Sequence, residues 1–293
     1  MTTETSERAR EFVERREMLL EELRVQPGGL EWCARHTGVV DDLVRSLYDW
    51  QAQSSEDMPR LAIVATGGYG RSELSPWSDV DLRLVPLDKA HPRLESTVKW
   101  LFRNLHEALS STMGLKVGYG LSYVSDAAGF DAKTRSGLMD SRVVVGSQEA
   151  HDDLMVALWS GFPVAEFVIE KVREQAAIES RTNDTPYSSH PHLKSGAGGL
   201  RCFHTANWIG AAIGEGTESP TDAYGFVLLA RNLLHLVAGR QLDHMTIPRR
   251  SEVAQLLGLE PLKFGSQLAE ALSQNDAAYK AMMERLHRAR FEL

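Results

Sequence analysis

The sequence predicts a mixed α/β domain joined to an all-helical domain. Two short apolar runs, residues 61–66 and 80–85, contain β-branched side chains and are separated by a glycine-rich segment, which is typical of buried strands. Beyond them the apolar residues recur at three- and four-residue spacing, the period of amphipathic helices. At 293 residues the chain is long enough for more than one domain. We divide it into N-terminal helices (1–60), an α/β domain (61–148) and a helical domain (149–293).

Each further element is predicted from the same two periodicities. Pro27, Gly28 and Gly29 end the first helical pattern. Residues 115–124 alternate well enough to form one more strand. The helices are expected over 6–25, 30–53, 94–112, 151–159, 163–182, 221–240 and 262–291.

Composition limits the class of protein. The hydrophobic content of 43% is that of an ordinary globular protein. A net charge of -8 argues against a general nucleic-acid binder, and a helix-turn-helix pattern at 251–271 contains few basic residues, so we expect no DNA partner. The N-terminus is charged, no apolar run is long enough for a membrane span, and Cys33 and Cys202 imply no disulfide framework. These features predict a cytoplasmic protein without a membrane partner.

The segment 61–86 carries the strongest functional signal. Gly67 and Gly68 allow the backbone to bend and to approach a ligand closely, and Arg71 adds a cation. Asp79 and Asp81 stand two apart at the start of a strand, so their carboxylates point to one face. Neighbouring carboxylates repel unless a cation lies between them. Mg²⁺, with Mn²⁺ as an alternative, prefers such oxygen ligands and completes its shell with water and phosphate.

These residues resemble a known family. The runs GGYGRSELSP (67–76) and SDVDL (78–82) are similar to the nucleotidyltransferase signature of the uridylyltransferases that modify the nitrogen-signalling protein PII. The resemblance implies a polymerase-β-type nucleotidyltransferase domain at 61–148, followed by a helical domain. It also implies that Asp79 and Asp81 are catalytic and hold the metal, while Gly67, Gly68, Arg71 and Ser78 bind the nucleotide.

The implied reaction is transfer of UMP or AMP. A hydroxyl of an acceptor would attack the α-phosphate of a nucleoside triphosphate, and pyrophosphate would leave. The resemblance implies that the acceptor is a tyrosine of a PII-like protein. Two alternatives stay open: the same chemistry on a small-molecule acceptor, or a catalytically weak nucleotide-binding pseudoenzyme that acts as a partner-binding module.

A second segment resembles the same family. Lys194, Gly198, Gly199 and Arg201 lie where glycines lead into a helix that we expect to begin near Cys202. Free N–H groups and the helix dipole favour a phosphate there, so these four residues are candidate nucleotide ligands. An ordinary glycine-rich helix start is the alternative. The family has an acidic residue where this chain has Cys202, and that departure raises the possibility of altered activity.

Three other features of the sequence bear on the site. The predicted strand 115–124 offers no third carboxylate, and Asp126 lies just beyond it. Asp140 and Arg142 match the family pattern before an apolar strand, but a structural ion pair between them is equally compatible. His190 and His192 are too few for a zinc site. Full-length relatives, as the resemblance implies, add a hydrolase domain and glutamine-binding regulatory domains; this sequence shows neither, so we expect transfer in one direction without a glutamine response.

Overall fold

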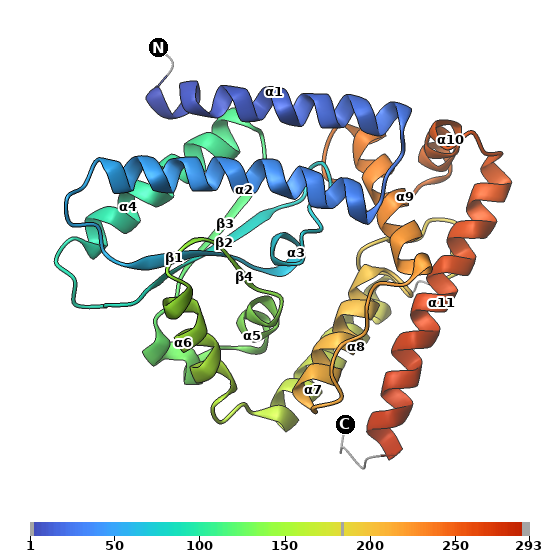
Figure 1. The fold of residues 1–293 in the computed structure, drawn as a ribbon. Helices are drawn as coiled ribbons and strands as arrows, with labels where there is room; N and C mark the ends of the chain where they lie inside the picture. The colour runs from blue at the N-terminus through green and yellow to red at the C-terminus, as the bar shows by residue number, and fades with distance from the viewer. Residues whose placement is uncertain (1–2, 183–184, 289–293) are drawn as a thin grey trace. The chain divides into compact units, whose positions relative to one another are not determined.

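The computed structural model describes residues 3–182 and 185–288. The predicted end of the last helix, 289–291, lies outside this part of the chain. The described residues form a mixed α/β structure with a small sheet and many helices (Figure 1). Two compact units are present: unit 1 comprises Met1–Leu20 and Trp32–Phe162, and unit 2 comprises Glu21–Glu31 and Pro163–Leu293.

Unit 1 contains all four strands of the sheet. Its order is β3-β2-β1-β4, with β1 antiparallel to β2 and to β4, and β2 parallel to β3. The register shifts between Ile63 and Val64, where β1 pairs with β4. The strands are β1 (Leu61–Ala65), β2 (Val80–Pro86), β3 (Val117–Leu121) and β4 (Arg142–Gly146).

Helices cover both faces of this sheet. On one face, α2 and α4 pack on Ile63, Leu82 and Leu84, and on the other, α6 packs on Ala62 and Val64 (Figure 1). Because side chains alternate along a strand, β1, β2 and β4 each supply residues to both cores. The elements that begin in unit 1, besides the strands, are α1 (Glu4–Val25), α3 (Gly67–Gly70), α4 (Leu94–Leu105), η1 (His106–Thr112), η2 (Val124–Gly129), α5 (Ala132–Met139) and α6 (Gln148–Trp159).

Unit 2 is helical apart from its loops. Val168, Ile209, Met282 and Leu286 form one buried cluster among three of its helices. The short stretch 21–31 belongs to this unit because Asn232 donates a hydrogen bond to the Gly28 carbonyl, at 3.0 Å. Its other helices, with α2 spanning the boundary, are α2 (Leu30–Gln53), α7 (Val164–Thr182), α8 (Leu200–Ala212), α9 (Asp222–Ala238), α10 (Ile247–Leu256) and α11 (Pro261–Arg288).

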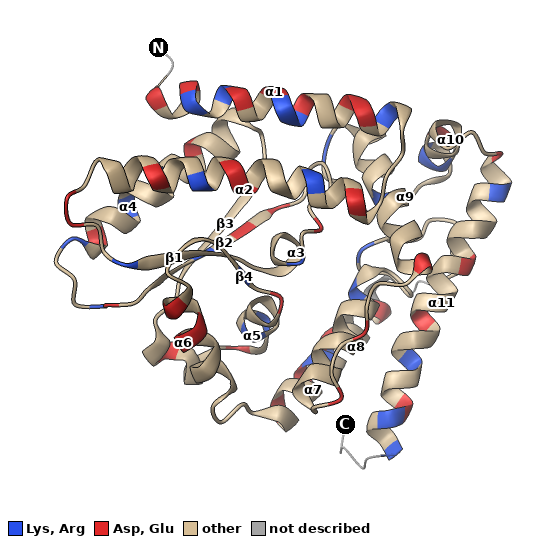
Figure 2. Ribbon diagram, in the orientation of Figure 1, with Lys and Arg blue, Asp and Glu red and all other residues tan. Residues whose placement is uncertain are grey.

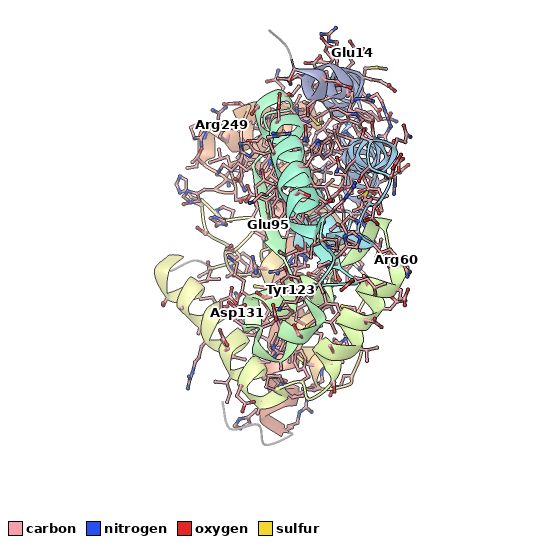
Figure 3. All side chains as sticks on the ribbon, turned by 90° about the vertical axis from the view of Figure 1, so that its left-hand side faces the viewer. Glu14, Arg60, Glu95, Tyr123, Asp131 and Arg249 are labelled. Atoms are coloured by element: carbon pink, nitrogen blue, oxygen red, sulfur yellow. The ribbon has the colours of Figure 1, made fainter. Side chains whose placement is uncertain are left out.

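Several element boundaries differ from those expected. The helix expected near Cys202 begins at Leu200, because Gly199 is extended and acts as its N-cap. The predicted strand 115–124 is shorter, since the chain turns into η2 between Tyr123 and Asp131, both labelled in Figure 3. Helix α5 was not predicted; the side chain of Asp131 caps it by accepting from the Thr134 N–H. Local capping thus decides ends that periodicity alone leaves open.

Charged side chains are spread over the helices. Along α1 the acidic and basic residues are interspersed, as Figure 2 shows. Mixed charge of this kind is typical of a solvated helix face. Among the described helices, none has an apolar stretch of the length needed to cross a bilayer.

Candidate functional site

The predicted glycine turn is a single helical turn, α3, between β1 and the loop that leads to β2. The side chain of its N-cap, Thr66, makes no capping hydrogen bond, and the Thr66 N–H donates to the Asp81 carbonyl at 3.0 Å. Gly67 has a φ of +55°, a left-handed conformation that favours glycine, and a Cβ there would lie 3.8 Å from Asp81 Oδ2. A Cβ at Gly70 would come within 2.1 Å of the Asp140 carbonyl oxygen. The turn therefore lies directly against Asp81, and Gly70 allows the close approach to Asp140.

Asp79 and Asp81 differ in their surroundings. Asp79 comes just before β2, and its Oδ1 is buried with no hydrogen-bond partner among the described residues. Asp81 is the second residue of β2 and is exposed, between the buried Val80 and Leu82. A buried carboxylate oxygen without a partner is costly. This pair of carboxylates thus has an unsatisfied oxygen and an accessible group at one end of the sheet.

The neighbouring strand gives Asp81 room. Gly118 of β3 is in register with Asp81, and a Cβ at Gly118 would lie 2.3 Å from Asp81 Oδ1. The Asp81 side chain therefore occupies the space next to Gly118 of β3 that a side chain at that position would fill. Asp126, which follows the strand in the sequence, lies in η2.

Arg71 is enclosed by two other carboxylates. Its Nε donates to Glu73 at 2.8 Å, and its Nη1 forms an ion pair with Asp140. The side chain of Arg71 is 23% exposed, whereas those of Glu73 and Asp140 are 7% and 12% exposed. Charge-assisted pairs of low exposure fix a guanidinium firmly. Arg71 is thus held rigidly beside the turn, with its charge shared between two acids.

The arrangement in unit 1 fits a hard divalent cation. Mg²⁺ usually takes one or two carboxylates from protein, and Asp79 supplies an oxygen that lacks a partner while Asp81 supplies an accessible one. Across the described part of the chain, no three or more His, Cys, Asp or Glu side chains converge as a metal-binding group. Any such ion would therefore depend on this pair together with water and ligand oxygens.

The second predicted region, in unit 2, has a different geometry. The N–H groups that open α8 are already used by the preceding loop: Leu200 donates to the Leu193 carbonyl at 3.0 Å and Arg201 donates to the Lys194 carbonyl at 2.8 Å. Cys202 donates to the Gly199 carbonyl at 2.9 Å. A phosphate at this helix start would have to be held by side chains, because these backbone donors have partners.

The glycines of this loop allow close packing. Gly198 has a φ of +70°, and a Cβ there would lie 1.8 Å from the Leu272 carbonyl oxygen of α11. Asn275 of the same helix donates to the Gly198 carbonyl at 3.1 Å. At Gly199 a Cβ would meet three carbonyl oxygens, from Leu193, Gly196 and His192, at 2.9–3.0 Å. Both glycines thus have a structural reason that needs no ligand.

Lys194 and Arg201 flank this loop. Lys194 lies between buried Leu193 and Gly196 and is partly exposed. Arg201 stands 5.4 Å over the ring of Trp208 and 3.8 Å from Glu174, with 27% of its side chain exposed. The structure thus places both cations beside the loop, with Arg201 anchored through its aromatic and acidic neighbours.

Cys202 occupies a buried polar pocket of unit 2. Its side chain is fully buried, and Gln175 of α7 donates to Sγ at 3.3 Å. Burial raises the pKa of the thiol to about 12, so the group is neutral at ordinary pH. A carboxylate at this position would have to be buried against the same neighbours. The cysteine is therefore suited to packing here, and it carries no charge toward Lys194 or Arg201.

The predicted site residues fall into two groups, one in each unit. Gly67, Gly68, Arg71, Ser78, Asp79 and Asp81 belong to unit 1, and Lys194, Gly198, Gly199 and Arg201 belong to unit 2. Asp140 and Arg142 each form an ion pair with another residue: Asp140 pairs with Arg71, and Arg142 pairs with Asp41 of α2.

Sequence reasoning gave no role to several residues around the site. Arg83 lies on the same face of β2 as Asp81 and donates to Ser122 at 2.7 Å, and strand alternation was sufficient to find it. Glu73 was visible within the signature, but its pairing with Arg71 was not. Asp41 lies on a predicted packing helix, where no local pattern marks it.

Comparison with known proteins finds uridylyltransferases that are similar to this chain. A sequence model of the family described as GlnD PII-uridylyltransferase matches residues 166–222. A bifunctional uridylyltransferase/uridylyl-removing enzyme of Erythrobacter litoralis is 30% identical over 276 residues, which cover 84% of this chain and 30% of that protein. The enzyme of the same name from Thiobacillus denitrificans is 31% identical over 263 residues, covering 81% of this chain and 29% of the relative. The enzyme of the same name from Burkholderia mallei is 32% identical over 242 residues, which cover 75% of this chain and 27% of that protein.

The sequence matches relate the chain to nucleotidyltransferases. By sequence it belongs to the PII-uridylyltransferase family. It spans between 27% and 30% of the length of the three relatives named above.

Proposed function

We propose that the chain is a nucleotidyltransferase that moves UMP or AMP from a nucleoside triphosphate to an acceptor hydroxyl with release of pyrophosphate. The observation that supports this most is the pair of Asp79 and Asp81 at the start of β2, in which Asp81 lies against the α3 turn and Asp79 has a buried carboxylate oxygen that lacks a partner among the described residues. The relatives that carry the names of uridylyltransferases support nucleotidyl transfer as the general chemistry.

Within this proposal the residues of unit 1 have distinct tasks. Asp79 and Asp81 would hold Mg²⁺, which when bound neutralises phosphate charge and polarises the α-phosphate. Gly67 and Gly68 would let the triphosphate approach the backbone, and Ser78 would donate from its hydroxyl. Arg71, fixed by Glu73 and Asp140, would present a cation whose position does not change as charge develops on the phosphates. We also propose that the α/β domain has the polymerase-β-type nucleotidyltransferase fold.

The residues of unit 2 have a smaller role in the proposed reaction. Lys194 and Arg201 would contribute cations to the nucleotide or to the acceptor, through their side chains. Gly198 and Gly199 would act by shaping the loop that carries them, since their packing leaves no room for a side chain. We propose a protein acceptor such as a PII-like regulator.

Two alternatives remain as further candidates. A small-molecule acceptor would use the same metal and nucleotide site. A weakly active nucleotide-binding module is favoured by one observation, the replacement of the family's acidic residue by the buried, neutral Cys202.

The test is a transfer assay with the four α-labelled ribonucleoside triphosphates, Mg²⁺, and separated protein and small-molecule fractions of a bacterial lysate. The proposal predicts label on an acceptor with UTP or ATP, dependent on the metal. Label in the small-molecule fraction alone would favour the second acceptor class. Nucleotide binding by calorimetry without any transfer would establish the module instead.

A further inference from the structure

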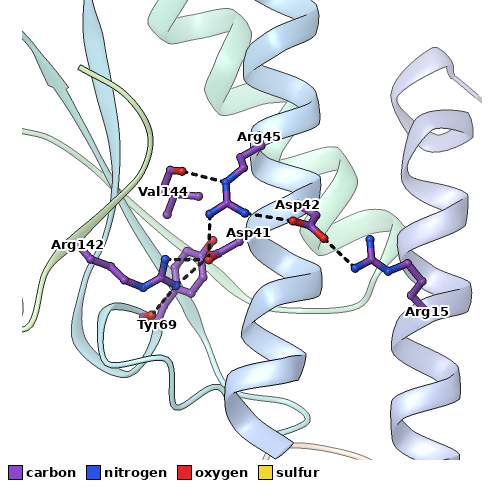
Figure 4. A network of polar contacts seen from close by, with 7 residues as sticks. All are labelled: Arg15, Asp41, Asp42, Arg45, Tyr69, Arg142 and Val144. Atoms are coloured by element: carbon purple, nitrogen blue, oxygen red, sulfur yellow. Dashed lines mark hydrogen bonds and ion pairs between the residues drawn. The ribbon is translucent and has the colours of Figure 1, made fainter. Parts of the chain in front are cut away.

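Asp41 of α2 forms a two-point ion pair with Arg142 at the start of β4. The two guanidinium nitrogens Nη1 and Nη2 donate to the two carboxylate oxygens at 2.8 and 2.9 Å (Figure 4). The Asp41 side chain is only 10% exposed, and Arg45 approaches it to 3.6 Å. Paired, charge-assisted hydrogen bonds of low exposure are strong and directional. This contact therefore fixes the Arg142 guanidinium relative to α2.

The same guanidinium contacts the α3 turn. Arg142 Nη2 also donates to the Tyr69 carbonyl at 3.3 Å, and the guanidinium carbon lies 5.3 Å from the centre of the Tyr69 ring (Figure 4). Tyr69 is completely buried, and burial together with the Asp41 charge raises its pKa well above the usual value. The Tyr69 hydroxyl thus stays neutral. The third residue of the turn is held by its carbonyl and by its ring at once.

The N-terminal helices also hold the loop that follows the turn. Arg16 of α1 donates to the Pro76 carbonyl at 2.7 Å. His36 Nδ1 donates to the Leu74 carbonyl at 2.9 Å, and the Thr37 hydroxyl accepts from the Leu74 N–H at 3.4 Å. These contacts are directed to backbone atoms, so they constrain the path of the chain between the turn and Asp79.

We infer that Asp41 is a positioning residue: through Arg142 it fixes the α3 turn, and thereby the carboxylates of Asp79 and Asp81. The turn is tied to Asp81 because the Thr66 N–H donates to the Asp81 carbonyl, so a displacement of one displaces the other. This inference rests on the proposed function only where it concerns the metal. The two N-terminal helices, α1 and α2, are then part of the structure that positions the site.

Asp42 supplies a matched control. It is the next residue of the same helix, carries the same charge, and pairs with Arg15 at 2.7 Å and Arg45 at 3.1 Å (Figure 4). Its side chain is 42% exposed, and the partners it has among the described residues lie on α1 and α2. Asp42→Asn therefore removes an equal charge without touching the turn.

The test measures amide hydrogen exchange over residues 67–79 in the full chain, for Asp41→Asn and Asp42→Asn. We expect exchange in this segment to rise about tenfold or more in Asp41→Asn and to stay at the wild-type level in Asp42→Asn. Mn²⁺ affinity, measured by electron paramagnetic resonance, should fall by about 10- to 100-fold in Asp41→Asn alone, the range typical of lost outer-shell partners. The double variant Asp41→Asn/Arg142→Gln covers the case in which the single variant misfolds, because it leaves no unpaired charge.

The outcomes separate the two proposals. Equal exchange in the Asp41 and Asp42 variants, or wild-type exchange in the double variant, would overturn the positioning role. Increased exchange with unchanged Mn²⁺ affinity would overturn the link between the turn and the carboxylates. If the wild-type chain binds no Mn²⁺, the proposed function fails, and the exchange data still decide whether Asp41 fixes the turn.

Discussion

Two glycine-containing segments of this protein look alike in sequence and differ in structure. Residues 67–70 form the short helix α3, residues 196–199 lead into α8, and an arginine follows each segment within two residues. At Gly67 the space around a possible Cβ is open except for Asp81 Oδ2 at 3.8 Å, whereas at Gly198 a Cβ would overlap the Leu272 carbonyl. The first segment lies beside the exposed Asp81 carboxylate, while the second leads into a helix whose first backbone donors are paired.

The difference shows that a glycine pattern alone does not distinguish ligand approach from tight packing. The deciding observation is which polar atoms stay available after the chain has folded. In unit 1 the Asp79 Oδ1 atom has no hydrogen-bond partner among the described residues, and the Asp81 side chain is exposed. In unit 2 the backbone N–H groups that open α8 are paired, and the polar groups that reach the surface are the partly exposed side chains of Lys194 and Arg201. We therefore expect chemistry to depend on the first segment and stability on the second.

The largest expected effect is the loss of transfer in Asp79→Asn and Asp81→Asn. Each substitution keeps the shape of the side chain but removes a charged metal ligand, so the rate should fall by orders of magnitude. The thermal midpoint should stay at or above that of the wild type, because Asp81 is exposed and Asp79 loses an unsatisfied charge. Rates are measured with α-labelled nucleotide at saturating Mg²⁺. Wild-type turnover in the double variant would contradict the assignment.

Gly198→Ala tests the packing role of the second segment, and Gly214→Ala is its control. The two glycines have similar φ values, +70° and +78°, but a Cβ at Gly214 would meet nothing within 4 Å. Both variants incur left-handed strain of about 1–2 kcal/mol. Only Gly198→Ala adds overlap with a backbone carbonyl, so its total loss should exceed about 3 kcal/mol. Denaturant unfolding measures both, and equal losses would show that the loop has room for a ligand.

Lowering the pH should destabilise the fold through His36, which contacts the loop that follows the α3 turn. Burial, and then the charge of Arg16, lower the pKa of His36 to about 4 from the usual 6.5. The unfolded chain therefore binds a proton between pH 6.5 and 4 that the folded chain does not. Stability is thus constant for this group above pH 6.5 and falls as the pH drops toward 4, by up to roughly 3 kcal/mol.

His36→Gln isolates this contribution. Because glutamine does not titrate, the variant should lose less stability than the wild type between pH 7 and pH 5, whatever its stability at pH 7. Denaturant unfolding at both pH values gives the difference. An identical pH dependence in the two proteins would show that His36 does not contribute.

Arg201→Ala should have the smallest effect. If Arg201 contacts phosphate, its loss weakens nucleotide binding by up to about tenfold, less than a free guanidinium would give because Glu174 shares its charge. Calorimetric titration with a nonhydrolysable triphosphate measures the change, and Arg201→Lys should recover part of it. Unchanged affinity in Arg201→Ala would leave this residue with its structural contacts to Glu174 and Trp208.

Much of the fold could be predicted from local patterns. The strands at 61–66 and 80–85 and most helices follow from periodicity, and the helix expected over 94–112 continues from α4 into η1. The limits of β3 and the presence of α5 could not be predicted, because a side-chain cap at Asp131 and the pairing with β2 decide them. Such contacts join residues that no short window contains.

Part of the candidate site could likewise be predicted from the sequence, and part of it could not. Asp79 and Asp81 were identified by spacing, and their proximity to the turn follows from strand pairing. The Arg71 contacts to Glu73 and Asp140 and the Asp41 contact to Arg142 connect residues up to 101 positions apart, so no sequence spacing reveals them. The role of Gly198 was predicted as phosphate approach; the fold gives it a packing reason that requires the position of α11.

The central claim is that unit 1 holds the metal through Asp79 and Asp81. Titration of Mn²⁺ into the full chain, followed by electron paramagnetic resonance with a nonhydrolysable triphosphate present, tests it most directly. The account predicts saturable uptake by the wild type, nearly abolished in the Asp79→Asn/Asp81→Asn variant and retained in Gly214→Ala. Equal uptake by the wild type and the double variant would contradict it.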